Sequence, residues 1–474
     1  MAMQPGTSLP IGGLSYVKGS DTPPLSELTV PALLANTAAL HGSRPAVVFR
    51  EQNIRWTWNE FSAEVDRMAS GLHALGLRKG DRVGIWSPNR FEWLLTQFAT
   101  ARVGLVMVNI NPAYRLAELE YALNKVGCKA IIAPEAFKTS RYLDMLATLA
   151  PELAKAEPGA LNAARLPLLR WVIRMEDVPT PGMLTFRELL ARGANVPKTE
   201  LDEITAGLDA RDPINIQFTS GTTGAPKGAT LTHRNIVNNG RSIAGAMRFS
   251  EQDKLCIPVP FYHCFGMVLG VLACVSTGAS MVFPGEAFHP GATMAAVSEE
   301  RCTALHGVPT MFIAQLDDPD FSKYDFSSLR TGIMAGAPCP VEVMKRVVAD
   351  MHLAEITIAY GMTETSPVSF QSATDDPIGK RVSTVGRVQP HLECKVVDVD
   401  GQTLPIGATG ELCTRGYSVM LGYWDDEERT REAIRDGWMH TGDLATIDEE
   451  GYCNIVGRVK DMLIRGAENV FPRE

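Results

Sequence analysis

The sequence predicts an α/β fold made of two doubly wound αβα-type regions and a smaller β-barrel-like region. Strand-like and helix-like segments alternate through the first 190 residues and again after residue 228, which is typical of a parallel sheet covered by helices on both faces. From Ser383 to Val456 the segments are short and β-rich, with Asp400-Gly401 and Glu450-Gly451 turns, and they predict a small antiparallel barrel or sheet. The 474 residues exceed one ordinary core, so we expect two or more packed lobes.

The elements of the first region follow from the spacing of apolar residues. Segment 59–75 has apolar residues at helical spacing, and Gly76 with the Lys79-Gly80-Asp81 turn then leads into a strand at 82–86. Beyond that strand the pattern predicts a helix at 91–103, a strand at 106–110, a helix at 117–126 and a strand at 130–133.

The second region repeats the pattern after residue 228. Its predicted strands are 254–258, 280–283, 304–307, 331–335 and 355–359, and those of the β-rich region are 393–397, 411–415 and 452–456. Segment 266–283 carries no charge over eighteen residues, which is long enough for a membrane span. Its three glycines and the hydroxyls of Ser276, Thr277 and Ser280 instead favour a buried helix and strand.

The composition excludes several classes of protein. The net charge is −9 and no basic stripe is visible, so we expect no nucleic-acid partner. The nine cysteines form no Cys-x-x-Cys pair, which indicates reduced thiols and neither a disulfide framework nor a metal site. The N-terminal segment lacks the pattern of a signal or transit peptide, so the expected location is the cytoplasm.

Segment 219–228 has the composition of a polyphosphate-binding loop. Glycines let backbone N–H groups approach an anion, hydroxyls add donors, and Lys227 adds a positive charge. The order is not that of the Walker-type loop, because Pro226 precedes Lys227 and Gly228 follows it. The alternative is a flexible polar turn. The candidate phosphate-binding residues are Thr219, Ser220, Gly221, Thr222, Thr223, Gly224, Ala225, Pro226 and Lys227.

Two further motifs follow predicted strands. His263, in Pro260-Phe261-Tyr262-His263, could gate a pocket or orient a carboxylate, and the alternative is a packed core histidine. In Tyr360-Gly361-Met362-Thr363-Glu364, the tyrosine offers a flat face for a purine, the threonine a hydroxyl for phosphate and the glutamate a hard oxygen for Mg²⁺. The alternative there is a helix N-terminus with an acidic first turn.

Three short segments complete the candidate nucleotide site. Gly336 and Ala337 follow the strand at 331–335, and the carboxyl ends of parallel strands are where open α/β sheets bind ligands. Asp443 follows a glycine turn and could hold ribose hydroxyls, although Gly-Asp often marks a solvated turn. Arg458 could bind ribose or phosphate, and its alternative is a surface salt bridge.

Together, in this order from 219 to 461, the motifs resemble those of the adenylate-forming (AMP-binding) superfamily. The resemblance extends from about Pro31 to Glu474, and segments 306–312, 332–338, 385–387 and 415–424 are most similar to the medium-chain fatty acyl-CoA ligases among the acyl-CoA synthetases. It implies an AMP-binding domain at 30–457, with subdomains at roughly 40–195, 205–380 and 381–457.

The resemblance implies a two-step reaction with ATP, Mg²⁺ and CoA. A carboxylate attacks the α-phosphate of ATP to give acyl-AMP and pyrophosphate, and the CoA thiol then displaces AMP. Lys227, Thr363, Glu364 and His263 would be the catalytic residues, with Glu364 as the ligand of Mg²⁺. Gly336, Ala337, Ala359, Tyr360, Gly361 and Met362 would surround the adenosine, and Asp443 and Arg458 would fix the ribose.

A medium- or long-chain fatty acid is the expected substrate. Acetyl-specific relatives carry a tryptophan at the position of Gly361, so its absence here would leave room for a longer tail. The expected acyl pocket comprises His263, Met267, Val268, Val308 and Gly361. An aryl- or branched-acid CoA ligase is the alternative within the superfamily, and a non-catalytic nucleotide-binding module is the alternative outside enzyme function.

The resemblance assigns the last residues to a hinge and the start of a second domain. Lys460 matches the hinge position of the family, and we expect 458–474 to be only the beginning of the small C-terminal α+β domain, which supplies the activating lysine in relatives. The expected partners are a carboxylic acid, ATP and CoA. No transmembrane segment is expected, while a peripheral membrane contact and a homodimer both stay open.

Overall fold

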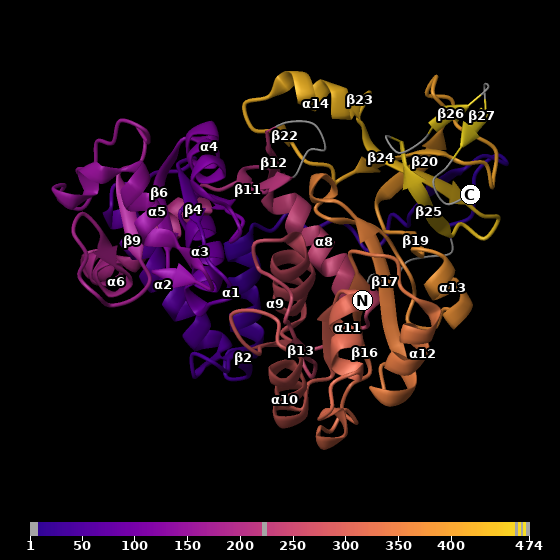
Figure 1. The fold of residues 1–474 in the computed structure, drawn as a ribbon, viewed down its shortest axis with the longest axis horizontal. Helices are drawn as coiled ribbons and strands as arrows, with labels where there is room; N and C mark the ends of the chain where they lie inside the picture. The colour runs from indigo at the N-terminus through magenta and orange to yellow at the C-terminus, as the bar shows by residue number, and fades with distance from the viewer. Residues whose placement is uncertain (1–7, 220–224, 460–462, 466–467, 471–474) are drawn as a thin grey trace.

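Three large sheets organise the computed structural model, which describes residues 8–219, 225–459, 463–465 and 468–470 (Figure 1). In Figure 1 the first sheet lies at the left, the second at the lower centre and right, and the third at the upper right. The α/β class predicted from the sequence is confirmed.

The first sheet has eight strands, and most of them are parallel. In spatial order they are β10 (Leu184–Thr185), β9 (Trp171–Arg174), β6 (Cys128–Ala133), β4 (Arg82–Ile85), β5 (Val106–Asn109), β11 (Pro213–Thr219), β12 (Lys227–Thr232) and β22 (Gly422–Tyr423). Helix α2 (Trp58–Ala74) precedes β4, and the helices between the later strands are α3 (Phe91–Arg102), α4 (Leu116–Val126), α5 (Tyr142–Leu149), α6 (Phe186–Arg192) and α7 (Lys198–Ala206).

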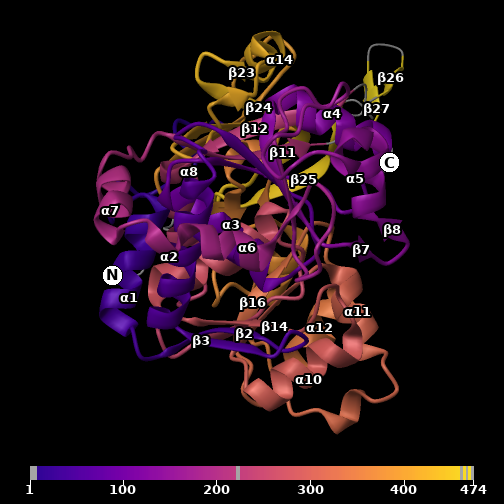
Figure 2. The same ribbon diagram turned by 90° about the vertical axis from the view of Figure 1, so that its left-hand side faces the viewer.

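The second sheet has nine strands and is parallel through its centre. In spatial order they are β19 (Arg387–Val388), β18 (Val368–Gln371), β17 (Glu355–Gly361), β16 (Thr331–Ala335), β15 (Ala304–Gly307), β13 (Lys254–Cys256), β14 (Ser280–Phe283), β2 (Pro45–Phe49) and β3 (Ile54–Thr57). Its helices include α10 (Pro290–Glu300), α11 (Pro309–Leu316), α12 (Val341–Asp350) and α13 (Ile378–Ser383). Figures 1 and 2 both show α10, α11 and α12 gathered at the end of the molecule opposite α14 (Glu427–Ala433).

The two large sheets exchange strands, in the sense that each contains strands from the part of the chain assigned to the other lobe. The expected subdomain boundaries therefore do not coincide with the sheets. Residues 45–57 form β2 and β3 of the second sheet, although the boundary 40–195 assigned them to the first lobe. Conversely, β11 and β12 lie in the first sheet, although 205–380 assigned them to the second. Boundaries drawn along the chain miss such pairings because strand partners are set by long-range contacts.

The third sheet is antiparallel, in agreement with the β-rich pattern. Its path runs β1 (Tyr16–Lys18), β20 (Leu392–Val397), β21 (Gly410–Gly416), β24 (Trp438–Ile447) and β23 (Ile434–Arg435), with β25 (Cys453–Arg458) also paired to β24. The N-terminal strand β1, which was not predicted, pairs with β20. Apart from short 3-10 turns, the remaining elements are α1 (Val30–His41), α8 (His233–Ala246), α9 (Ala273–Thr277), the π-helix η3 (Phe265–Leu272) and four short strands, β7 (Ala136–Phe137), β8 (Ser140–Arg141), β26 (Leu463–Arg465) and β27 (Glu468–Val470).

The packing of α2 shows how local sequence sets the core. Thr57 caps the helix and forms a capping box with Glu60. The apolar residues that follow at helical spacing, Phe61, Val65, Met68 and Leu72, are all buried.

The uncharged stretch 266–283 is likewise buried as η3, α9 and β14, as expected. Among the described residues, no helix is both long and apolar enough to cross a bilayer.

Candidate active site

The predicted phosphate loop joins β11 to β12. These strands pair antiparallel, so that Thr219 lies opposite Lys227, while Ser220, Gly221, Thr222, Thr223 and Gly224 lie outside the described residues. Lys227 Nζ donates a hydrogen bond to the Tyr423 hydroxyl over 3.0 Å and lies 4.4 Å from the centre of that ring. The lysine forms no ion pair with any residue that the structure describes.

Glu364 contacts the same Tyr423 hydroxyl as Lys227. It belongs to the 3-10 turn η5 (Thr363–Thr365) after β17, and it is only 4% exposed. Its Oε1 accepts hydrogen bonds from the Tyr423 hydroxyl over 2.9 Å and from Thr219 Oγ1 over 3.1 Å. No cation pairs with it in the described part of the chain. A buried carboxylate without a cationic partner favours a metal ion or another positive ligand.

Tyr423 is a site residue that the sequence reasoning missed. Short strand β22 places it, because Tyr423 pairs with Ala229 of β12 and therefore lies next to Lys227. Burial and the neighbouring Glu364 carboxylate raise the pKa of the Tyr423 hydroxyl, which therefore stays a neutral donor. The segment 415–424 was noted only for its resemblance, and nothing within it signals a contact with residues two hundred positions away.

Asp443 forms the opposite side of the site, where the third sheet meets the second. Its Oδ2 accepts a hydrogen bond from the Tyr360 hydroxyl over 2.6 Å, and its own N–H donates to Thr441 Oγ1 over 3.1 Å. Arg458 lies opposite Asp443 in the β24–β25 pairing, and Arg458 Nε is 3.7 Å from Asp443 Oδ1. Burial and the Asp443 carboxylate raise the pKa of Tyr360, which keeps it protonated as the donor.

His263 follows the end of β13 and opens into the same cavity. Its Nδ1 accepts a hydrogen bond from the Phe265 N–H over 3.1 Å, so the neutral ring carries its proton on Nε2. The surrounding protein lowers the pKa of His263, because the enclosed charged form loses its hydration. A neutral Nε2–H donor suits a carboxylate or phosphate oxygen.

A cavity of about 810 Å³ connects these groups. The predicted residues that line it are Thr219, Ala225, Pro226, Lys227, His263, Gly361, Met362, Thr363, Glu364, Asp443 and Arg458. Gly336, Ala337, Ala359, Tyr360, Met267, Val268 and Val308 do not line it. The hinge candidate Lys460 lies outside the described residues.

The strands expected to flank adenine do lie side by side. Ala335 pairs with Ala359, so the segment that continues into Gly336 and Ala337 ends beside Tyr360.

Gly361 has its own steric reason to be glycine. A Cβ there would lie 1.8 Å from the Pro367 carbonyl oxygen, closer than any real contact. A side chain at this position would therefore move the backbone before it filled a pocket.

The expected acyl pocket is only partly brought together. Met267 and Val268 are fully buried in η3, and Met267 Sδ accepts hydrogen bonds from Asn109 Nδ2 over 3.3 Å and Gln217 Nε2 over 3.1 Å. Val308 is half-buried beside Gly336, where a Cβ on the glycine would lie 3.3 Å from Val308 Cγ1. None of these three residues lines the cavity.

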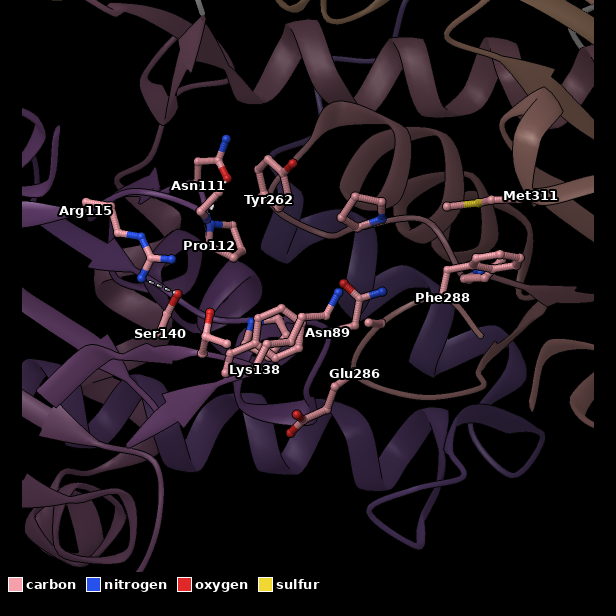
Figure 3. A pocket seen from close by; sticks show the side chains of 17 residues that line it. Asn89, Asn111, Pro112, Arg115, Lys138, Ser140, Tyr262, Glu286, Phe288 and Met311 are labelled. Carbon is pink, nitrogen blue, oxygen red and sulfur yellow. Dashed lines mark hydrogen bonds between the residues drawn. The ribbon is translucent and has the colours of Figure 1, made fainter. Parts of the chain in front are cut away.

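A second pocket of about 400 Å³ shares Asn111 and Tyr262 with the large cavity. Figure 3 shows Arg115 and Ser140 at one end, Phe288 and Met311 at the other, and Tyr262 between them. Arg115 donates to Ser140 Oγ over 3.0 Å, and neither it nor Lys138 forms an ion pair within the described chain. The pocket thus has a cationic end and an apolar end.

The comparisons with known proteins identify the family of this chain. The model of the AMP-binding enzyme family matches residues 34–424. YngI of Bacillus subtilis (strain 168) is 50% identical over 94% of this chain and 81% of its own length. The bovine mitochondrial medium-chain acyl-CoA ligase ACSF2 is 46% identical over 98% of this chain and 77% of its own length. A Mycobacterium tuberculosis fatty acyl CoA synthetase has the same fold, with a TM-score of 0.78 and 26% identity over 94% of this chain and 81% of that one.

The chain belongs to the AMP-binding enzyme family. The expected resemblance to acyl-CoA synthetases is confirmed, and the protein is an ATP-dependent acid–CoA ligase.

Proposed function

We propose that this ligase activates medium-chain fatty acids, with the acyl-AMP formed in the 810 Å³ cavity. The observation that carries the proposal is the pair of opposite charges that line that cavity. Lys227 and Glu364 lack ionic partners in the described chain and meet only through the Tyr423 hydroxyl. Such a pair is suited to a ligand that brings both anionic oxygens and a divalent cation.

Lys227 would hold the phosphate oxygens of ATP, since it begins the strand after the phosphate loop. Thr363, next to Glu364 and lining the same cavity, would add a hydroxyl donor. Tyr423 would release Lys227 when phosphate arrives, because a hydrogen bond between an ammonium and a phosphate joins two opposite charges, whereas the bond to the phenol has a charge only on its donor.

Glu364 would hold Mg²⁺, and its surroundings fit that cation. The carboxylate is buried and accepts two hydroxyl hydrogen bonds on Oε1, while Oε2 has no protein partner among the described residues. When bound, Mg²⁺ would offset the charge that develops on the leaving pyrophosphate.

Asp443 would accept hydrogen bonds from the ribose hydroxyls, with Tyr360 holding its carboxylate in place. Tyr360 thus acts as a positioning residue, because its hydroxyl is already used by Asp443. The ends of β16 and β17, at Gly336–Ala337 and Tyr360–Gly361, would lie against the purine.

His263 would orient the substrate carboxylate by donating from Nε2. From there the acid's tail would extend past Tyr262 towards Phe288 and Met311, the apolar end of the second pocket. A volume of about 400 Å³ lies in the range of small-ligand pockets. Each CH₂ buried there contributes about 0.8 kcal/mol, so the depth of this end would set chain-length preference.

CoA would approach from the opposite, cationic end of the second pocket. Arg115 and Lys138 present two unpaired positive charges there, which suits the phosphates of CoA. In this arrangement the thiol and the acyl carbonyl meet near Tyr262, where the two pockets join.

Calorimetry with acyl-sulfamoyl adenosines tests the proposal without requiring turnover. We expect the octanoyl compound to bind more tightly than the acetyl, palmitoyl and benzoyl compounds. Equal affinity for acetyl and octanoyl compounds would show that no pocket receives the tail. Tightest binding of the benzoyl compound would favour an aryl-acid ligase instead.

A further inference from the structure

Beside the turn that carries Asp443, three side chains with metal-binding atoms face one another. Glu411 and Cys413 lie two residues apart on β21 and therefore on one face of the sheet. His440 of β24 is the direct strand partner of Cys413. The sequence reasoning excluded a metal site because the cysteines form no spaced pairs. These three groups come from two strands, and only the sheet register brings them together.

The distances among the three groups are close to those of a zinc site. Cys413 Sγ lies 3.5 Å from His440 Nδ1, and Nδ1 lies 2.8 Å from Glu411 Oε2. Zn–S and Zn–N bonds of ordinary length in a tetrahedron place sulfur and nitrogen about 3.6 Å apart, and Zn–N with Zn–O requires about 3.3 Å. The thiol and imidazole already have the required separation, and the carboxylate must withdraw by only about half an ångström.

We propose that Glu411, Cys413 and His440 form a binding site for Zn²⁺ or a similar soft divalent cation, distinct from the Mg²⁺ site at Glu364. A thiolate, an imidazole and a carboxylate are a ligand set that selects zinc over magnesium. His440 Nδ1 now donates to Glu411, which as a carboxylate can only accept, and the metal ion would replace that proton and the thiol proton.

The fourth coordination position opens towards the nucleotide cavity. Glu411 and His440 both line that cavity, whereas Cys413 is fully buried behind them. A water molecule or an oxygen of the bound nucleotide would complete the tetrahedron. The site therefore has three protein ligands and one open position.

Metal binding at this place would inhibit the ligase by moving the Asp443 turn. Glu411 Oε1 accepts a hydrogen bond from the Gly442 N–H over 3.1 Å, directly before Asp443. A metal ion that shifts the Glu411 carboxylate weakens this bond and displaces the carboxylate proposed to hold ribose. This consequence rests on the proposed nucleotide site, whereas the metal site itself does not.

Neighbouring cations limit the affinity. Lys395 lies 4.5 Å from the centre of the Trp438 ring, and Arg435 is the strand partner of Trp438. Lys395 is also the strand partner of Cys413, and the charges of Lys395 and Arg435 both act on the Cys413 side chain and oppose the binding of a further cation. We therefore expect reversible binding, so that the metal regulates the enzyme and is not needed for its fold.

The experiment is titration of the metal-free protein with Co²⁺ alone, followed by competition with Zn²⁺. We expect visible absorption bands of tetrahedral cobalt together with a near-ultraviolet sulfur-to-cobalt charge-transfer band, both removed by Zn²⁺. Cys413→Ser should abolish the charge-transfer band and weaken Zn²⁺ binding at least tenfold. Cys339→Ser is the matched control, because Cys339 is the one cysteine of the nine that is not fully buried.

A charge-transfer band that survives in Cys413→Ser but disappears in Cys339→Ser would overturn the proposal, as would the absence of any cobalt–sulfur band in the wild type.

Inhibition is tested separately, by measuring the affinity for AMP with and without Zn²⁺. We expect Zn²⁺ to weaken AMP binding by the wild type and not by Cys413→Ser. Cobalt bands that depend on Cys413 without any effect on AMP would refute the inhibitory role and leave the metal site standing.

Discussion

The Tyr360 hydroxyl donates a hydrogen bond to Asp443 Oδ2 over 2.6 Å and thereby joins two sheets. Tyr360 lies near the end of β17 in the second sheet, and Asp443 lies in β24 of the third. Because the contact crosses this boundary, the position of the proposed ribose-binding carboxylate depends on how the two sheets are docked.

Asp443→Asn should weaken the binding of AMP and ATP by a similar factor, about tenfold or more, since ribose is common to both and a charge-assisted acceptor is lost. Calorimetry with each nucleotide measures the effect. Asp448→Asn, a partner of Lys380 on the surface, is the matched control. If only ATP binding weakens, Asp443 lies near the phosphates instead. Tyr360→Phe should show the same pattern with a smaller loss.

Lys227→Ala should weaken ATP binding by about tenfold or more while changing AMP binding little, because the β- and γ-phosphates lose a positive charge. Lys345→Ala is the control, since Lys345 is an exposed lysine paired with Glu342 on α12. Unchanged ATP affinity in Lys227→Ala would mean that the loop is a structural turn.

The two ends of the second pocket can be separated by measuring the two half-reactions. Met311→Trp should lower acyl-AMP formation from octanoate far more than from acetate, because the indole fills the apolar end. Pyrophosphate release measures this step. Similar losses for both acids would place the tail elsewhere.

Arg115→Ala should leave pyrophosphate release unchanged and raise the KM for CoA in thioester formation, because it removes a charge at the cationic end only. Lys125→Ala provides a control of equal charge on nearby helix α4. A loss in the first step would show that Arg115 acts on the acid or ATP.

Stability should fall as the pH falls from about 6.5 to 4. Burial lowers the pKa of both His233 and His306 to about 4. Their Nδ1 atoms accept backbone hydrogen bonds from Val30 and Ile333, which only a neutral ring can do. Between these pH values the unfolded chain binds protons that the folded chain excludes, so each histidine lowers the free energy of unfolding by about 2 kcal/mol near pH 5.

His306→Gln tests this origin by urea unfolding at neutral pH and near pH 5. Glutamine can keep a donor towards the Leu269 carbonyl and cannot titrate. The variant should lose about 2 kcal/mol less than the wild type between the two pH values. An identical loss in both proteins would assign the pH dependence to other groups.

Much of the second sheet was predictable from the sequence. The strands at 280–283, 304–307 and 331–335 have the predicted bounds, because buried parallel strands are short apolar runs between turns. The helix expected at 59–75 is confirmed as α2, one residue earlier at each end. Periodicity and capping are local properties, and these elements depend on them.

The contacts that complete the site were not predictable in this way. Tyr423 reaches Lys227 only through the β22–β12 pairing, and Glu411 reaches His440 only through the register of β21 and β24. At Gly361 the absence of a side chain was interpreted as pocket space, but the nearby Pro367 carbonyl explains the glycine equally well. For this reason Met311, and not Gly361, is the position chosen for testing the acyl pocket.

The exchange of strands between the two large sheets determines how the chain can be divided. A fragment that ends near residue 200 would carry β2 and β3 without β14, their neighbour, and β5 without β11. Each half would then expose unpaired strand edges, which favour aggregation. We expect the two halves to be insoluble when produced singly and to reassemble when produced together, so a break near Pro197, just before α7, would make a split-enzyme reporter.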